Sequence, residues 1–252
     1  FSNPDETRMK LYHDEITTPV RDAASIVLLR DHADGLQVFL MKRHGLSDVL
    51  GGAYVFPGGK VDEADAQLDA AQYFDQDSSA LPAALDEIEL TPNQASALFV
   101  AALRESFEES GVLFAAQATG EQIQAATALH QEGLPFKQIL QQLALRLQTQ
   151  NIVPWSRWIT PKMSSVSHKR FDTRFFIAAL PANQTASSAN HETTESIWLS
   201  PREALTSYWN KEISFAPPQI MSLVHLARHD SVASIMQQAK QTPVPLIEPQ
   251  PY

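Results

Sequence analysis

The sequence contains no cysteine among its 252 residues. This absence excludes disulfide bonds, thiolate metal sites and a cysteine nucleophile, and it suits a reducing compartment. The chain also has no uninterrupted apolar run as long as a membrane span, and the polar residues 1–15 lack the apolar core of a signal peptide. We therefore expect a cytoplasmic protein that does not interact with membranes.

Positive charge is scarce, because 19 Lys and Arg residues stand against 29 Asp and Glu residues, which gives a formal net charge of −10. This balance argues against a nucleic-acid partner and against binding to a membrane surface. Hydrophobic residues make up 44% of the chain, which is enough for a core. We therefore expect a globular protein of one large domain or two small ones.

Three glutamates lie close together in the string Arg-Glu-Ser-Phe-Glu-Glu-Ser-Gly-Val at residues 104–112. On a helix, Glu105, Glu108 and Glu109 share one face, where like charges destabilise the helix by roughly 0.2–0.5 kcal/mol per pair. A divalent cation offsets this repulsion, and Mg²⁺ prefers oxygen ligands such as carboxylates and substrate phosphates. The string therefore favours a metal site for phosphate chemistry. The alternative is a solvated acidic face on a helix of an unrelated α/β protein.

The opposite side of the same helix is apolar and suits packing on a core. The residues on that side are Phe99, Leu103 and Phe107. Thr91 and Pro92 are typical of an N-cap followed by proline at the first helical position, and Gly111 is typical of the residue just past a helix end. We therefore expect one amphipathic helix between this cap and Gly111.

Strand and helix patterns alternate along the rest of the chain, which predicts an α/β fold. Strands are expected at residues 23–30, 36–43, 53–56, 112–116, 155–160, 171–180 and 197–199, the first two joined as a hairpin. Further helices are expected at residues 81–88, 202–208, 217–228 and 232–240, and two within 120–151.

Upstream of the acidic string, residues 56–62 have the sequence Phe-Pro-Gly-Gly-Lys-Val-Asp. Together the two strings resemble the Nudix box, G-x5-E-x7-R-E-U-x-E-E-x-G-U, in which U is a bulky aliphatic residue. The residues that match in register are Gly59, Arg104, Glu105, Glu108, Glu109, Gly111 and Val112. Asp65 stands at the position of the first glutamate, Ser106 replaces the first aliphatic residue, and the spacer at residues 66–103 is 38 residues long. This split box resembles a subgroup of Nudix hydrolases related to peroxisomal coenzyme A diphosphatases.

The resemblance implies an α/β fold of the Nudix type, an α/β/α sandwich with a mixed sheet. We expect a single domain over residues 1–252 with helical insertions at about 66–97 and 118–150. Four prolines lie near the end of the chain, so residues 241–252 are expected to form an extended tail. The resemblance also admits a homodimer, because family members often dimerise.

The activity that the resemblance implies is metal-dependent hydrolysis of a diphosphate linkage in a nucleoside diphosphate derivative. Glu105, Glu108 and Glu109 would hold one to three Mg²⁺ or Mn²⁺ ions, helped by the backbone carbonyl of Gly59. Arg104 would orient a glutamate through a charge-assisted pair.

The general base is left open by the resemblance. Glu105 is one candidate, and a carboxylate from a later loop, Glu192 or Glu195, is another. The alternative for the later loop is an ordinary solvated surface segment.

Positive side chains are needed to bind the phosphates, and three arginines are candidates. Arg170 and Arg174 alternate with Asp172 along an expected strand, so the two arginines point the same way. Arg43 lies at the end of the second expected strand. The alternative for Arg170 and Arg174 is an edge strand protected by charge.

Coenzyme A or an acyl derivative is the favoured substrate. Arg43, Gly52 and the Phe-Pro-Gly-Gly string fit the pattern of coenzyme A hydrolases of the family, whereas Met41, His44 and Asp48 depart from it. The family's markers for ADP-ribose and NADH are absent. The alternatives are a hydrolase acting on ADP-ribose or another dinucleotide, and a non-catalytic module that binds a nucleotide metabolite as a sensor or scaffold.

Overall fold

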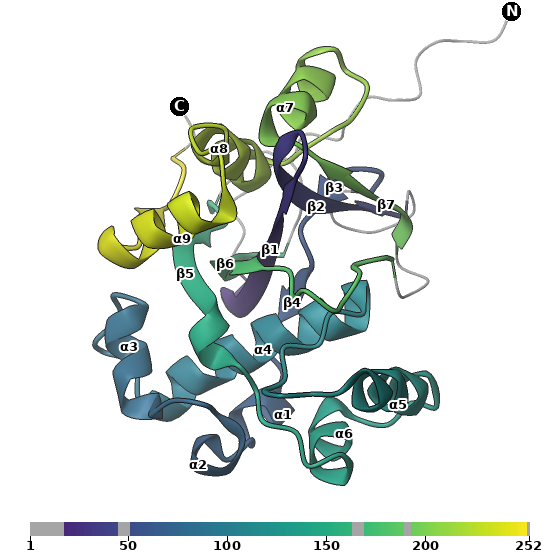
Figure 1. The fold of residues 1–252 in the computed structure, drawn as a ribbon. Coiled ribbons are helices and arrows are strands. Elements are labelled where there is room, and N and C mark those ends of the chain that lie inside the picture. Colours follow the sequence, from purple (N-terminus) through teal and green to yellow (C-terminus); the bar gives the residue numbers. More distant parts are fainter. Residues whose placement is uncertain (1–17, 45–50, 163–168, 189–192, 251–252) are drawn as a thin grey trace, which may run out of the picture.

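A mixed eight-stranded sheet between two layers of helices forms the centre of the computed structural model (Figure 1), which describes residues 18–44, 51–162, 169–188 and 193–250. The strand order is β3-β2-β1-β6-β5-β8, with β4 paired to β1 and β7 paired to β2. The β1–β6 and β5–β8 pairs are parallel and the others are antiparallel. The strands are β1 (Arg21–His32), β2 (Gly35–Arg43), β3 (Tyr54–Val55), β4 (Gly58–Lys60), β5 (Ile152–Ile159), β6 (Phe171–Ala179), β7 (Thr193–Leu199) and β8 (Leu246–Ile247). The expected mixed sheet is confirmed.

Each face of the sheet carries its own apolar core, because successive side chains of a strand point to opposite faces. On β1, Ile26 and Leu28 belong to the core under helix α4 (Pro92–Ser110), whereas Val27 and Leu29 belong to the opposite core. The helices that cover the second face are α7 (Pro201–Trp209), α8 (Pro217–Leu226) and α9 (Val232–Gln241). The α/β/α sandwich is therefore confirmed.

Helix α4 has the boundaries that its terminal residues predict. The Thr91 side chain and the Gln94 side chain form a capping box at its start, with proline at the first helical position. Gly111 follows the last turn with φ of 73°, a left-handed conformation that glycine adopts without strain. Apolar residues of α4 pack on the sheet, and this packing presents its acidic face toward strand β4.

The long spacer is helical, but it forms several short turns and not one helix. They are α1 (Glu63–Ala66), α2 (Ala70–Tyr73), a 3₁₀ turn (Ser78–Ala80) and α3 (Leu81–Ala84). Asp69 and Asp77 each accept a bond from a backbone N–H two residues later, which starts a new turn and interrupts the previous one.

The second helical segment consists of α5 (Gly120–Gln131) and α6 (Phe136–Gln142), and both helices were predicted. Phe136 packs against Phe107 of α4, with ring centroids 5.9 Å apart. Figure 1 shows α2 and α3 near the start of α4, and α5 and α6 near its other end. The two segments therefore flank opposite ends of the helix that carries the glutamates.

The expected strand at residues 112–116 is wrong. These residues contain one isolated bridge, between Ala115 and Leu147, and no strand. The Gln184 side chain bonds both the N–H and the carbonyl of Leu113, at 2.8 and 2.7 Å. Phe114 and Ala116 instead bond the backbone of Gln148 and Arg146. The segment is therefore buried without joining the sheet, since its polar groups find partners elsewhere.

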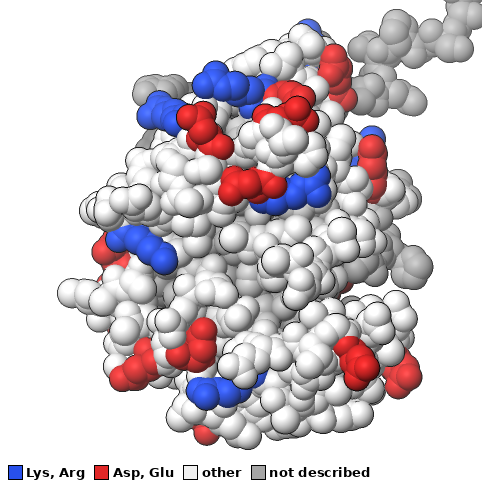
Figure 2. All heavy atoms as spheres, in the orientation of Figure 1, with Lys and Arg blue, Asp and Glu red and all other residues white. Residues whose placement is uncertain are grey.

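The proline-rich end of the chain lies along the sheet. Residues Leu246–Ile247 pair with β5, the Arg157 N–H donates to the Pro245 carbonyl at 2.9 Å, and the Val244 N–H donates to Asp86 at 2.6 Å. Within the described ranges, no helix is both long and apolar enough to cross a bilayer. On the face drawn in Figure 2, the coloured basic side chains lie among acidic ones and do not gather into one patch.

Candidate active site

The glycine turn and the acidic face of α4 are in direct contact. Gly58 donates its backbone N–H to Glu109 Oε2 at 2.9 Å. A Cβ atom on Gly59 would lie 2.3 Å from Glu105 Oε1, so only glycine permits this approach. The fold therefore joins the two parts of the box across the 38 residues at 66–103.

Arg104 lies between these parts and uses all five of its N–H groups. Its Nε and Nη2 donate to Asp65 Oδ1 and Oδ2 at 2.9 and 3.0 Å, a bidentate pair. Its Nη1 donates to Glu105 at 2.7 Å and to Glu108 at 3.0 Å, and Nη2 also donates to the Lys60 carbonyl at 3.1 Å. Arg104 therefore orients two of the glutamates and has no donor left for a substrate.

Burial governs the electrostatics of this cluster. Burial raises the pKa of Glu105 from 4.5 to about 7, against the lowering effect of Arg104. Burial works to lower the pKa of Arg104, but the hydrogen bond and charge of Asp65, with the charges of Glu105 and Glu108, raise it above its ordinary value. The arginine is therefore a permanent cation inside an acidic site.

The candidate donors fit a hard divalent cation, because three carboxylates and the Gly59 carbonyl would supply only oxygen ligands. Among the described residues, however, no three acidic or histidine side chains already converge as an ion site. Arg104 holds one oxygen each of Glu105 and Glu108, and Gly58 holds one oxygen of Glu109. A cation at this cluster would therefore meet carboxylates that Arg104 and Gly58 already orient.

Arg43 ends β2, two residues after Met41, whose side chain belongs to the core under α4. Strand alternation therefore places Arg43 on the sheet face that α4 covers. Its Nε atom is buried and has no hydrogen-bond partner among the described residues. Arg43 therefore stays a candidate for binding a phosphate.

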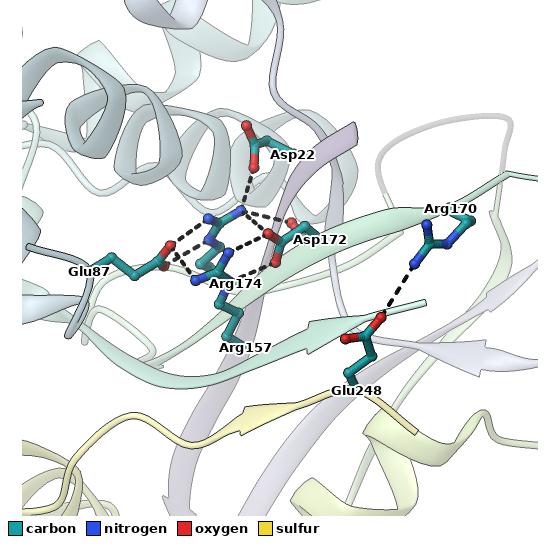
Figure 3. Close-up of polar contacts among 7 residues, drawn as sticks. All are labelled: Asp22, Glu87, Arg157, Arg170, Asp172, Arg174 and Glu248. Carbon is teal, nitrogen blue, oxygen red and sulfur yellow. Dashed lines mark hydrogen bonds and ion pairs between the residues drawn. The ribbon is translucent and has the colours of Figure 1, made fainter. Parts of the chain in front are cut away.

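Arg170 and Arg174 are engaged elsewhere, as Figure 3 shows. Arg174 is 3% exposed and donates to both carboxylate oxygens of Glu87, at 2.9 and 2.6 Å. It also pairs with Asp172 and Asp22. The structure therefore does not leave Arg174 open to a substrate, although the alternation correctly placed it beside Asp172.

Arg170 donates to the Thr160 carbonyl at 2.9 Å and pairs with Glu248 at 3.4 Å. This second contact joins the residue before β6 to Glu248, just after β8, and does not involve the glutamate cluster (Figure 3). Arg157 completes the buried ionic group by pairing with Glu87 and Asp172, each at 2.7 Å. Sequence patterns gave no signal for Glu87, because its partners lie far along the chain.

Glu195 lies on the sheet face opposite α4. It is the cross-strand neighbour of Lys42, and its carboxylate accepts a hydrogen bond from the Tyr54 hydroxyl at 2.9 Å. Tyr54 belongs to the core under α7, α8 and α9. The structure therefore does not bring Glu195 to the cluster, and the other later-loop candidate, Glu192, lies outside the described residues.

A family model described as the NUDT19 Nudix domain matches residues 20–226. The chain belongs to this Nudix family. The resemblance drawn from the split box is therefore confirmed, including its likeness to proteins named coenzyme A diphosphatases.

The Nudix chain is 28% identical to acyl-coenzyme A diphosphatase NUDT19 of Xenopus laevis over 233 residues, which cover 78% of this chain and 61% of the relative. It is 27% identical to the Homo sapiens protein of the same name over 239 residues, with 81% and 64% covered. The Nudix chain thus spans about three fifths of the length of these relatives.

The fold agrees with a solved Nudix structure. The crystal structure of a NUDIX hydrolase from Alicyclobacillus acidocaldarius superposes with a TM-score of 0.69 at 24% identity, covering 90% of this chain and 98% of that one. This Nudix domain therefore has a fold that an experimental structure also has.

Proposed function

We propose that the chain is a Nudix hydrolase that uses Mg²⁺ or Mn²⁺ to cleave the diphosphate linkage of a nucleoside diphosphate derivative. The observation that carries this proposal is the contact of Gly58 and Gly59 with Glu109 and Glu105. A structural acidic helix needs no such contact, whereas a metal site made from both parts of the box requires it.

Hydrolysis of a diphosphate brings water to an anionic phosphorus, so the barrier is largely electrostatic. A bound divalent cation supplies charge neutralisation at the phosphates and lowers the pKa of bound water. Glu105, Glu108 and Glu109 would hold the cation, together with the Gly59 carbonyl. Arg104 keeps two of these carboxylates in place through its bonds of 2.7 and 3.0 Å.

Glu105 is the general base in this proposal. Its carboxylate is partly buried beside the glycine turn, whereas Glu195 lies across the sheet. A base must lie within hydrogen-bond distance of the attacking water, directly or through one further water. Of these two carboxylates, only Glu105 is on the face of the sheet that carries the acidic cluster.

The favoured substrate is coenzyme A or acyl-coenzyme A. Support comes from the curated relatives, which are named acyl-coenzyme A diphosphatases, and from Arg43 with its unsatisfied donor. Arg43 would bind a phosphate of the substrate through charge-assisted hydrogen bonds.

A substrate panel tests the proposal. The panel contains coenzyme A, an acyl-coenzyme A, ADP-ribose, NADH and a dinucleotide polyphosphate, each assayed with Mg²⁺ and with a chelator. We expect the coenzyme A compounds to be cleaved when Mg²⁺ is present and not when the chelator is present. Cleavage of ADP-ribose or a dinucleotide instead would reassign the substrate, and binding without cleavage would identify a non-catalytic module.

The Glu108→Gln variant connects the activity to the cluster. It removes one charge from the proposed ion site, so turnover should fall by about 100-fold or more. Glu89→Gln is the matched control, because Glu89 is an exposed glutamate in the loop before α4. Full activity of Glu108→Gln would remove the proposed ligand role.

A further inference from the structure

A cavity of about 310 Å³ lies between strand β5, helices α8 and α9, and the proline-rich end of the chain. Trp158, which lines the cavity, belongs to the apolar core under α7, α8 and α9 and not to the core under α4. Figure 1 shows α8 and α9 close to β5, away from α4. Ligand pockets typically have volumes of about 300–1,000 Å³, so the cavity has room for a small molecule. It is separate from the acidic cluster.

The wall that β5 and α8 contribute is apolar and partly aromatic. Trp155 and Trp158 line it from β5, and Met221, which is 44% exposed, lines it from α8. The His225 ring packs edge-on against Trp155, with ring centroids 6.0 Å apart and an interplanar angle of 82°. Flat ring systems pack favourably on aromatic side chains, and a methionine sulfur also contacts rings favourably. This wall therefore favours a ligand with an aromatic body.

Prolines form much of the remaining wall. Pro154 lies on β5, whereas Pro243 and Pro245 lie in the docked end of the chain. The Arg157 N–H donates to the Pro245 carbonyl at 2.9 Å, which holds this segment against β5. Proline has a fixed φ and no backbone N–H, so this wall is rigid and presents apolar rings. A rigid wall lowers the entropy cost of binding a ligand.

The charge of the cavity differs from that of the whole chain. The chain has 29 acidic residues against 19 Lys and Arg residues. The described residues that line the cavity include no acid, and Arg228 is the one charged side chain among them. Arg228 is exposed, and it forms no ion pair within the described ranges. A negatively charged ligand would therefore find a cation here and no opposing carboxylate in the walls.

We propose that this cavity binds a small aromatic anion, with its ring system against Trp155 and one carboxylate, sulfonate or phosphate group paired with Arg228. Aromatic walls select the body of the ligand, and the arginine selects the sign of its charge. The site goes beyond the proposed hydrolysis, because none of its residues belongs to the acidic cluster.

The first test is isothermal titration calorimetry of the full chain with three probes. They are 2-naphthoate, its neutral analogue 2-naphthamide, and octanoate, an anion without a ring. We expect 2-naphthoate to bind about 3–5-fold more tightly than 2-naphthamide, since an ion pair with an exposed arginine contributes modestly. Octanoate should bind at least about 3-fold more weakly than 2-naphthoate. The proposal is overturned if 2-naphthoate shows no saturable binding, or if either other probe binds as tightly.

Two substitutions locate the binding. Arg228→Gln should lower the affinity for 2-naphthoate by about 3–5-fold and leave that for 2-naphthamide unchanged. Arg21→Gln is the matched control, because Arg21 is an exposed arginine at the start of β1 that does not line the cavity. Trp155→Leu should lower the affinity for both naphthalene probes by about 2–10-fold. If Trp155→Leu does not fold, Arg228→Gln decides, and full 2-naphthoate affinity in that variant would overturn the proposal.

A third variant separates this site from the candidate active site. Glu108→Gln should bind 2-naphthoate within about 2-fold of the unmodified chain, with or without a chelator, because Glu108 does not line the cavity. A larger change would place the probe at the acidic cluster and contradict the proposal. A chain that cleaves no member of the substrate panel would refute the proposed function and leave these binding experiments unaffected.

Discussion

Gly59 illustrates how a single missing atom shapes the candidate site. A Cβ at this position would lie 2.3 Å from Glu105 Oε1, and the atoms that it meets belong to a side chain and not to the backbone. Gly59→Ala should therefore leave the fold intact while it displaces the Glu105 carboxylate. A misplacement of about 1 Å costs roughly 100-fold in rate, and we expect a loss of that order in kcat.

Gly120→Ala is the control for this prediction. Gly120 is also a glycine without a left-handed backbone, and a Cβ there meets no atom within 4 Å. Steady-state kinetics measures kcat of both variants, and thermal unfolding tests whether their fold is intact. Equal kcat values for the two variants would mean that the contact between Gly59 and Glu105 has no catalytic consequence.

For Glu195 we predict that a substitution leaves the activity almost unchanged. Burial and the hydrogen bond to Glu195 raise the pKa of Tyr54 from 10.0 to about 12. The folded state favours the protonated phenol, so this stabilisation is complete below pH 10 and is lost as the pH rises toward 12. Glu195→Gln should lower the pKa of Tyr54 while activity stays within about 3-fold, since the residue lies across the sheet.

Tyrosinate absorbance, followed during an alkaline titration, measures this change, with Tyr54→Phe to identify the signal among five tyrosines. Burial remains in the Glu195→Gln variant, so the pKa should stay above 10. A loss of turnover as large as that of Glu105→Gln would restore Glu195 as the general base.

At the residue scale, a contiguous motif predicted residues that the structure brings together at the candidate site, such as Arg104 and Glu105. It did not predict the partners of Arg174, because Glu87 and Asp22 lie 87 and 152 residues away. Strand alternation predicts which face of the sheet a side chain lies on, but not which residues it contacts. A phosphate-binding arginine and a buried structural arginine therefore have the same pattern in one sequence.

The N-cap of helix α4 and its acidic cluster lie toward opposite ends of the helix, so the stability of the helix and the activity can be tested separately. The Thr91 side chain accepts a bond from the Gln94 N–H at 3.3 Å. Thr91→Ala should lower the free energy of unfolding by about 1 kcal/mol. Glu105 lies about 20 Å farther along the helix at 1.5 Å per residue, so kcat should not change. Urea unfolding combined with kinetics tests both statements, and a loss of kcat would show that the helix transmits the disturbance.

Local signals explain which elements were predicted. A capping threonine, a proline and a terminal glycine together fix α4, and each acts within a few residues. The segment 112–116 is apolar enough for a strand, but Gln184, about 70 residues away, bonds both backbone groups of Leu113. Hydrophobic pattern alone cannot report such a partner.

At the scale of the whole molecule, alternation and composition predicted the layers but not the strand order. The parallel pairing of β1 with β6 joins residues near 21–29 to residues near 171–179, and no local pattern encodes it. The docking of the chain end on β5 was likewise not predicted, since four prolines in a short tail indicate only an extended segment.

The buried ionic group of Figure 3 joins these distant parts, and it supports a final prediction. Glu87 lies in the segment before α4, and Arg174 and Arg157 lie on β6 and β5. Arg174→Met would leave Glu87 and Asp172 buried with only Arg157 as a shared partner. Removing one member of a buried pair typically destabilises a protein by about 3–5 kcal/mol, and we expect the lower end because Arg157 remains.

Adding Glu87→Gln to Arg174→Met should recover part of that loss, because it removes the uncompensated charge. Arg228→Met, at an exposed arginine, should change the free energy of unfolding by no more than about 0.5 kcal/mol. Urea unfolding of the four proteins measures these differences. A loss in Arg174→Met no larger than that of the control would mean that the ionic group does not hold the inserted segment against the sheet.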